Sequence, residues 1–163
     1  MAKAMSKTNA MRILEREKIP YREHTYSHDD GAIDGISVAE KMGQDPGQVF
    51  KTLITRSSHG GIYVFVIPVA KELDLKAAAR AAGVKSIAMI HVSEILEITG
   101  YIRGGCSPIG MKKLYPTSFD CACQNLETVI VSGGKIGYQI EVAPQDLIRL
   151  TRGSVAPLTK EGL

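Results

Sequence analysis

Apolar residues recur along the chain at two spacings, one typical of helices and one typical of strands. Two apolar, β-branched runs, 49–55 and 62–68, flank the polar, glycine-bearing segment 57–61, and this arrangement predicts a β-hairpin. Thr8 and Asp74 each precede a helical repeat of apolar residues, so we expect them to cap helices. Further helices are expected over 37–43, 93–100 and 145–151, and further strands over 21–26, 84–89, 128–131 and 139–142.

The interspersed helices and strands predict the fold class. Because a hairpin excludes a purely parallel sheet, we expect an α/β fold of the mixed α+β type with a strongly curved mixed sheet. A length of 163 residues suits a single domain over 1–163.

Composition excludes several classes of protein. Hydrophobic residues make up 44% and charged residues 23% of the chain, as in ordinary globular proteins. The formal net charge is only +3, so the chain lacks the large basic excess of a dedicated duplex-binding protein, and we expect no DNA partner. The longest apolar run is far below the about 20 residues that span a bilayer, so no membrane partner is expected. Three cysteines without a secretory signal favour the reducing cytoplasm.

Two glycine-rich segments, 100–113 and 132–137, are candidates for a binding site. Glycine lets the backbone approach a ligand and turn its N–H groups toward anions or carbonyl oxygens. Tight turns explain either segment alone, but the two together favour a site. The second segment is not a nucleotide phosphate loop, because Val129 and Ile136 stand where that motif requires Gly and Ser or Thr.

Cysteine spacing does not predict a metal site. Cys121 and Cys123 are spaced as a chelating pair, but no second pair of ligands accompanies them, so structural thiols are the simpler interpretation. We expect no metal and no other cofactor.

Lys51 is the most informative single residue, because it interrupts an apolar strand. By period-two alternation it shares a face with Val49 and Leu53, and a lysine among buried residues is rare unless its charge has a partner. It is either an edge-strand lysine whose ammonium reaches water or a pocket cation for a phosphate or carbonyl oxygen.

Five segments carry a resemblance to a known family, and they include Lys51 and both glycine-rich segments. They are HTYSHD (24–29), VFKTL (49–53), PVAKELDLKAAARAAG (68–83), TGYIRGGCSPIGMKK (99–113) and VSGGKIG (131–137). In this order they resemble the YbaK/EbsC family, free-standing relatives of the editing domain in bacterial prolyl-tRNA synthetase. The resemblance covers roughly residues 8–150 and implies a closed or nearly closed mixed β-barrel with flanking helices.

The resemblance also implies which residues form the site. The counterpart of Lys51 is the essential pocket lysine of the family, and the N–H groups of Gly104 and Gly105 are placed to stabilise a developing oxyanion. Gln139 departs from the acidic residue that many cysteine-specific members carry near this position, which leaves the preferred amino acid open. The other implied substrate-binding residues are Tyr26, Tyr101, Ser107, Pro108, Ser132, Gly133 and Gly134.

The implied activity is trans-editing, the removal of a wrongly attached amino acid from the 3′ end of an aminoacyl-tRNA. The family is best known for releasing Cys from tRNA(Pro), with the substrate's own thiol as nucleophile, and a transient complex with prolyl-tRNA synthetase is a further implied partnership. Two alternatives stay open. One is a deacylase for Ala or Ser that uses a bound water, and the other is a non-catalytic module that binds tRNA or a synthetase.

Overall fold

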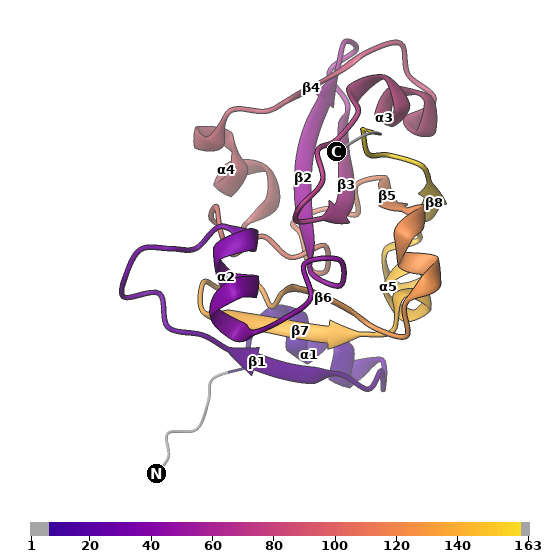
Figure 1. Ribbon diagram of the computed structural model, residues 1–163. Helices are drawn as coiled ribbons and strands as arrows, with labels where there is room; N and C mark the ends of the chain where they lie inside the picture. Colours follow the sequence, from indigo (N-terminus) through magenta and orange to yellow (C-terminus); the bar gives the residue numbers. More distant parts are fainter. Residues whose placement is uncertain (1–6, 161–163) are drawn as a thin grey trace.

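The central element of the fold is a five-stranded sheet with the strand order β4-β2-β3-β5-β8 (Figure 1). The computed structural model describes residues 7–160. Strand β2 pairs antiparallel with β3 and β4, whereas β3 pairs parallel with β5 and β5 pairs parallel with β8. The predicted hairpin and the predicted mixed sheet are therefore confirmed. The strands are β2 (Phe50–Ser57), β3 (Ile62–Pro68), β4 (Ile87–Met89), β5 (Thr117–Asp120) and β8 (Ser154–Ala156).

A second, three-stranded antiparallel sheet has the order β1-β7-β6 and consists of β1 (Arg22–Thr25), β7 (Tyr138–Val142) and β6 (Val129–Ser132). One parallel bridge between Val49 and Ile130 joins it to the larger sheet, and the Ile130 N–H donates to the Gln48 carbonyl at 2.9 Å. The strands of residues 7–160 form two sheets at an angle, and these residues do not form the implied closed barrel.

Five α-helices and two short 3₁₀ helices flank the sheets in the described part of the chain. Thr8 and Asp74 cap α1 and α3 as predicted, because each side chain accepts a hydrogen bond from the first turn. The predicted start of α2 at Ser37 is wrong, since Asp34 is the cap and accepts from the Ser37 N–H at 3.1 Å. The helices are α1 (Asn9–Arg16), α2 (Gly35–Met42), α3 (Leu75–Ala82), α4 (Ile95–Thr99), α5 (Pro144–Thr151), η1 (Val92–Glu94) and η2 (Cys121–Asn125).

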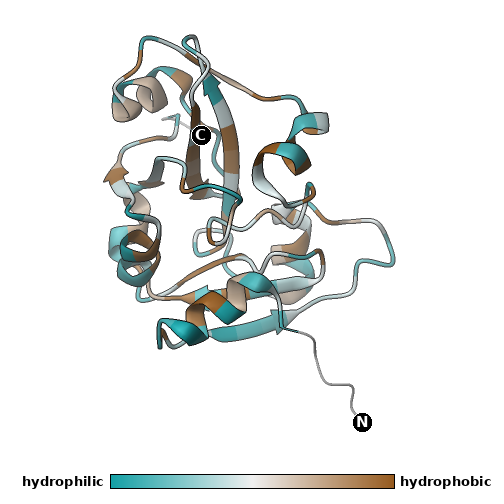
Figure 2. Ribbon diagram, turned by 180° about the vertical axis from the view of Figure 1, so that it is seen from behind, coloured by the Kyte–Doolittle hydropathy of each residue, from teal (hydrophilic) through white to brown (hydrophobic). Residues whose placement is uncertain are grey.

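The larger sheet is buried on both faces, which explains the continuous apolar run of β3. Val64 and Val66 pack into the main core with α1 and the smaller sheet, whereas Phe65 and Ile67 pack against α3. Strands covered on both faces read as unbroken hydrophobic runs. In Figure 2, the visible part of β3 is largely brown, whereas β1, which carries the sequence REHT, is teal.

The mixed α+β fold is confirmed for the described residues. Strands β5 and β8 and the helix η2 were not predicted, because their segments are too short to show a periodicity. The predicted domain bounds, 1–163, include residues 1–6 and 161–163, which lie outside the described part of the chain. None of the helices in residues 7–160 is long and apolar enough to span a membrane.

Candidate functional site

A cavity of about 550 Å³ is lined by both sheets, by the N-terminal turn of α2 and by the first glycine-rich segment. Five of the eleven predicted site residues line it, and they come from four different parts of the chain. These are Tyr26, Lys51, Gly104, Ser132 and Gln139.

Lys51 is the half-buried cation of this cavity. It lies on β2 opposite Ile67 of β3, in the second position of the strand. In residues 7–160 its ammonium has no hydrogen bond or ion pair. Burial lowers the pKa of Lys51, and the negative charge of Glu72 opposes this shift. A partly desolvated ammonium without a protein partner is suited to an anionic or carbonyl oxygen of a ligand.

Gly104 and Gly105 lie at different depths. Gly104 lines the cavity with a φ of +86°, and a Cβ there would come within 2.9 Å of Ile33 Cδ1. Gly105 is buried, and its N–H donates to the Ile102 carbonyl at 2.9 Å. A Cβ on Gly105 would lie 3.1 Å from the backbone nitrogen of Ile136. Gly105 therefore permits close packing of the two glycine-rich segments, whereas Gly104 faces the ligand space.

Tyr101 lies behind the cavity wall and braces the glycine-rich segments. Its side chain is buried, its hydroxyl donates to the Ile109 carbonyl, and burial raises the pKa of Tyr101 to about 12. A Cβ on Gly134 would come within 3.2 Å of the Tyr101 ring. Ser107 is also buried and accepts from the Ile109 N–H at 3.3 Å. These residues shape the loop, and they do not line the cavity.

The second glycine-rich segment reaches the cavity through Ser132. The Ser132 hydroxyl accepts from the Gly134 N–H at 3.2 Å, and the Gly133 N–H donates to the Tyr138 carbonyl at 2.9 Å. Gly133 and Gly134 thus form the turn that presents Ser132. The remaining predicted residue, Pro108, lines a different groove.

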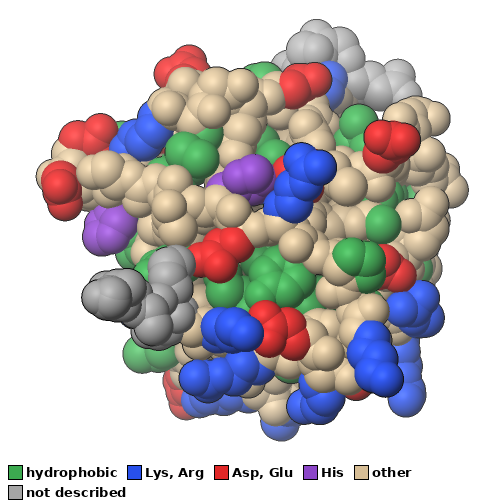
Figure 3. All heavy atoms as spheres, turned by 90° about the horizontal axis from the view of Figure 1, so that it is seen from below, with side chains coloured by type: hydrophobic (Ala, Val, Ile, Leu, Met, Phe, Trp, Pro, Cys, Tyr) green, Lys and Arg blue, Asp and Glu red, His purple; other side chains and the backbone are tan. Residues whose placement is uncertain are grey.

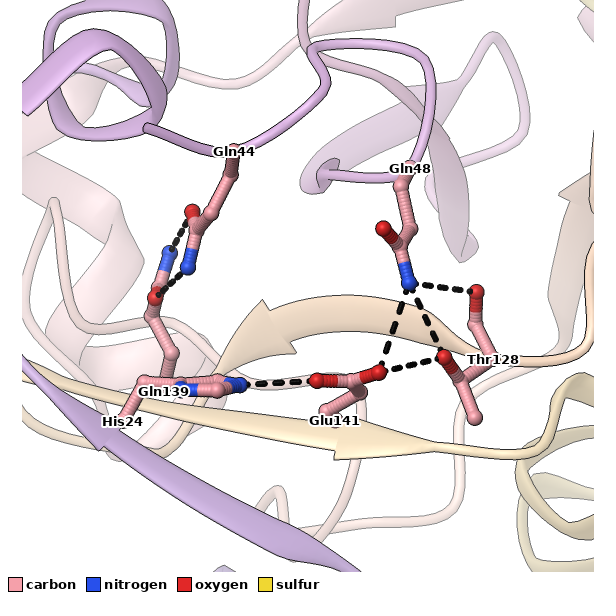
Figure 4. Close-up of polar contacts among 6 residues, drawn as sticks. All are labelled: His24, Gln44, Gln48, Thr128, Gln139 and Glu141. Carbon is pink, nitrogen blue, oxygen red and sulfur yellow. Dashed lines mark hydrogen bonds and ion pairs between the residues drawn. The ribbon is translucent and has the colours of Figure 1, made fainter. Parts of the chain in front are cut away.

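Gln139 is buried and held by a reciprocal amide pair. Gln44 Nε2 donates to Gln139 Oε1 at 2.8 Å, and Gln139 Nε2 donates to Gln44 Oε1 at 3.2 Å (Figure 4). Each side-chain amide is hydrogen-bonded to the other. The pair therefore joins the segment after α2 to the smaller sheet and holds this part of the cavity wall in place.

Glu141, two residues further along β7, is the centre of a second network (Figure 4). One of its oxygens lies 2.8 Å from His24 Nε2, and the other accepts from Thr128 Oγ1 at 2.6 Å and from Gln48 Nε2 at 3.4 Å. The hydrogen bond from Thr128, together with the contact to His24, lowers the pKa of Glu141. This carboxylate is the acidic residue that follows the second glycine-rich segment, but its contacts are structural ones.

Sequence reasoning missed several residues that line the cavity. Thr52 follows Lys51, and its buried hydroxyl has no hydrogen-bond partner in residues 7–160. Arg103 lies within the first glycine-rich segment, and Ile33 lies in the loop between β1 and α2. Thr52 and Arg103 stand within the VFKTL and GYIRGG segments, so attention to every polar residue of those segments would have found them.

The described residues hold no group of three or more His, Cys, Asp or Glu side chains arranged for a metal ion. The polar groups that line the cavity are a lysine, an arginine, hydroxyls, amides and one aspartate. The aspartate is Asp34, whose carboxylate caps α2. The chemistry of the lining suits an oxygen-rich organic ligand.

The chain is similar to several known proteins. The family model described as "Aminoacyl-tRNA editing domain" matches residues 34–150. A protein of Enterococcus faecalis (strain ATCC 700802 / V583), named "Putative Cys-tRNA(Pro)/Cys-tRNA(Cys) deacylase EbsC", is 46% identical over 157 residues, which cover 96% of each chain.

Two solved structures share the fold. One is described as "Crystal structure of a putative trans-editing enzyme for prolyl tRNA synthetase"; it is 25% identical with a TM-score of 0.78, over 95% of this chain and 99% of that chain. The other, "Crystal structure of hypothetical protein APE2540", is 23% identical with a TM-score of 0.83, over 91% of this chain and 97% of that chain. The second likeness bears on the fold alone.

Proposed function

Because the chain belongs to the aminoacyl-tRNA editing domain family, we propose that it is a trans-editing deacylase that cleaves the ester bond of a mischarged aminoacyl-tRNA. The single observation that carries this proposal is the unpartnered ammonium of Lys51 in a cavity bordered by Gly104. The preferred substrate is Cys on tRNA(Pro), in line with the name of the Enterococcus relative. The enzyme acts in the cytoplasm, where charged tRNA is available.

Lys51 and Gly104 have separate roles in this mechanism. The ammonium of Lys51 holds the phosphate of the terminal adenosine or the ester carbonyl oxygen. The N–H of Gly104, which has no acceptor in residues 7–160, donates to the oxygen that becomes negative in the transition state. Gly105 supports this geometry from behind, since its own N–H is bonded to Ile102.

The substrate's thiol supplies the nucleophile. Its sulfur attacks the ester carbonyl carbon, the bond from that carbon to the ribose oxygen breaks, and the proton of the thiol passes to the leaving oxygen. A thiolactone is released and opens in water to free cysteine. An ester is already activated and the thiol is one ring closure away, so positioning supplies much of the rate.

A panel of mischarged tRNAs tests the proposal directly. We expect the chain alone to release Cys from tRNA(Pro) faster than Ala or Ser, and to leave correctly charged Pro-tRNA(Pro) intact. Addition of prolyl-tRNA synthetase tests the further partnership, which predicts a higher rate at limiting tRNA concentration. Binding of tRNA without release of any amino acid would instead identify a non-catalytic module.

Thr52→Val tests the orphan hydroxyl of the cavity. A buried polar group without a partner costs about 1–3 kcal/mol, so we expect the isosteric valine to leave the free energy of unfolding unchanged or to raise it. We expect kcat/KM for Cys-tRNA to fall about tenfold, because we propose that this shielded hydroxyl becomes accessible when substrate binds and forms a hydrogen bond with it. Thr52→Ser, which keeps the hydroxyl, is the control. Equal activity in the valine variant would show that the hydroxyl does not contact substrate.

Gln139→Asp tests amino-acid preference. A carboxylate would attract the α-ammonium of the substrate more strongly than an amide does. Aspartate is one methylene shorter than glutamine and has no N–H, so the bond from Gln44 Nε2 would lengthen and Gln44 Oε1 would lose its donor; we therefore also expect a loss of about 1–3 kcal/mol in unfolding free energy. The measurement is the rank order of Cys, Ala and Ser esters. An unchanged order would place Gln139 outside the specificity-determining residues.

A further inference from the structure

A second groove, of about 500 Å³, lies away from the cavity, between the end of α1, the segment 108–115 and the end of α5. We call it the basic groove and define it by residues 16–17, 113–115 and 149–152. Its lining carries four cations and one acid. The cations are Arg16, Lys113, Arg149 and Arg152, and the acid is Glu17.

The four cations are exposed and weakly engaged. Arg16 Nε lies 3.5 Å from a Glu17 oxygen, and Arg149 lies 3.2 Å from Asp146. Exposed ion pairs of this kind contribute about 0–1 kcal/mol, so a stronger anion can replace them. The side chains of Lys113 and Arg152 have no hydrogen bond or ion pair with any described residue. Figure 3, seen from the end of the molecule where α1 and β1 lie, shows Lys and Arg side chains gathered along one edge.

Backbone conformation provides an independent observation at the groove. Helices α2, α3 and α4 end at the left-handed glycines Gly43, Gly83 and Gly100. After α1 and α5, the helices that border the groove, the left-handed positions hold Lys18 (φ 58°), which follows residues 16–17 but is not part of the groove lining, and Arg152 (φ 54°), which lines the groove. In residues 7–160 no other non-glycine residue has a positive φ. A side chain in this conformation costs energy that glycine avoids, so the chain retains basic side chains there at some expense in stability.

The basic groove and the cavity are connected through one loop and one helix. The loop that contributes Gly104 to the cavity continues into 108–115, which lines the groove. Helix α1 packs against both glycine-rich segments. A Cβ on Gly134, in the second segment, would meet Thr8 and Ala10 at the start of α1, and a Cβ on Gly110, in the first segment, would meet Ile13. With eight residues, α1 is about 12 Å long. That length corresponds to a few nucleotides of RNA backbone.

We propose that the basic groove binds the phosphate backbone of the RNA whose aminoacylated 3′ end occupies the cavity, a proposal that rests on the proposed function. The 3′ end enters between Lys51 and Gly104, and the chain of phosphates runs along α1 to Lys113 and Arg152. The net charge of the whole protein is only +3. The local excess of positive charge in the groove therefore indicates that this face contacts RNA.

The test combines Lys113→Ala with Arg152→Gly, neither of which touches the cavity. Glycine suits the left-handed position, so the double variant should keep its unfolding midpoint. The matched control removes the same charge by Arg80→Ala, on α3, with Lys85→Ala, three residues after the end of α3; this helix lies at the opposite end of the molecule from α1 (Figure 1). The measurements are the Kd for uncharged tRNA over a range of salt concentrations, and kcat/KM for Cys-tRNA and for cysteinyl-adenosine.

We expect the Kd of the groove variant to rise about tenfold at 0.15 M salt and the slope of log K against log salt to fall by about 2. Its kcat/KM should fall for Cys-tRNA and stay unchanged for cysteinyl-adenosine, which has no phosphate backbone. An unchanged Kd, or the same loss in the control, overturns the proposal, and so does a loss confined to binding of prolyl-tRNA synthetase. Absence of deacylation by the wild type, with RNA affinity still dependent on the groove, would refute the proposed function alone.

Discussion

Lys51→Ala is expected to lower kcat/KM for Cys-tRNA by about 100-fold or more while the protein remains folded. Removal of one preorganised group that stabilises developing charge typically costs a factor of 10²–10³. The fold should tolerate the change because the Lys51 ammonium has no protein partner in residues 7–160 that the substitution would leave unpaired. Steady-state deacylation and thermal unfolding, measured on the same preparation, check both parts.

Two further variants separate the charge of Lys51 from its bulk. Lys51→Met keeps the length of the aliphatic chain and removes the ammonium, so it should be as inactive as the alanine variant. Lys76→Ala removes an exposed lysine on α3 and should behave as wild type. Substantial turnover by Lys51→Met would mean that the side chain only fills space, and the assigned role would be wrong.

The elements that the sequence predicted well are those with strong local signals. The hairpin follows from two β-branched runs around a polar turn, and the caps of α1 and α3 follow from Thr8 and Asp74. Strands β5 and β8 have three or four residues each, and their parallel pairing with the larger sheet depends on contacts far apart in sequence. Local pattern therefore predicted the hairpin and the capped helices, but not the full strand order.

The residues of the candidate site were also predicted only in part. Lys51 was recognisable because a charge in an apolar strand conflicts with its surroundings. Tyr101, Gly105 and Ser107 belong to the same motif as Gly104, but sequence alone does not tell which of them faces the ligand. The structure separates them, since Tyr101 and Ser107 are buried and bonded to Ile109 and the Gly105 N–H is bonded to Ile102.

The structure also bears on which thiol acts. Cys106 lines the cavity and is the obvious protein nucleophile, but burial raises the pKa of its thiol to about 11. A thiol with a raised pKa is almost entirely protonated at neutral pH and is a poor nucleophile. In the described part of the chain, no histidine lines the cavity to take the proton. Cys121 is exposed and Cys123 is buried, and neither lines the cavity.

The second large effect is therefore expected from the substrate. Alkylation of the thiol of Cys-tRNA should abolish release by the wild-type enzyme, because no sulfur remains to attack the ester carbonyl. Cys106→Ala, and the triple alanine variant of Cys106, Cys121 and Cys123 if it folds, should retain most of their activity toward the unmodified substrate. The assay is release of radiolabelled amino acid from tRNA, with mass spectrometry of the enzyme to detect an acyl adduct. Release of the alkylated amino acid would indicate attack by a bound water, and an acyl adduct on Cys106, together with loss of activity in folded Cys106→Ala, would make Cys106 the nucleophile.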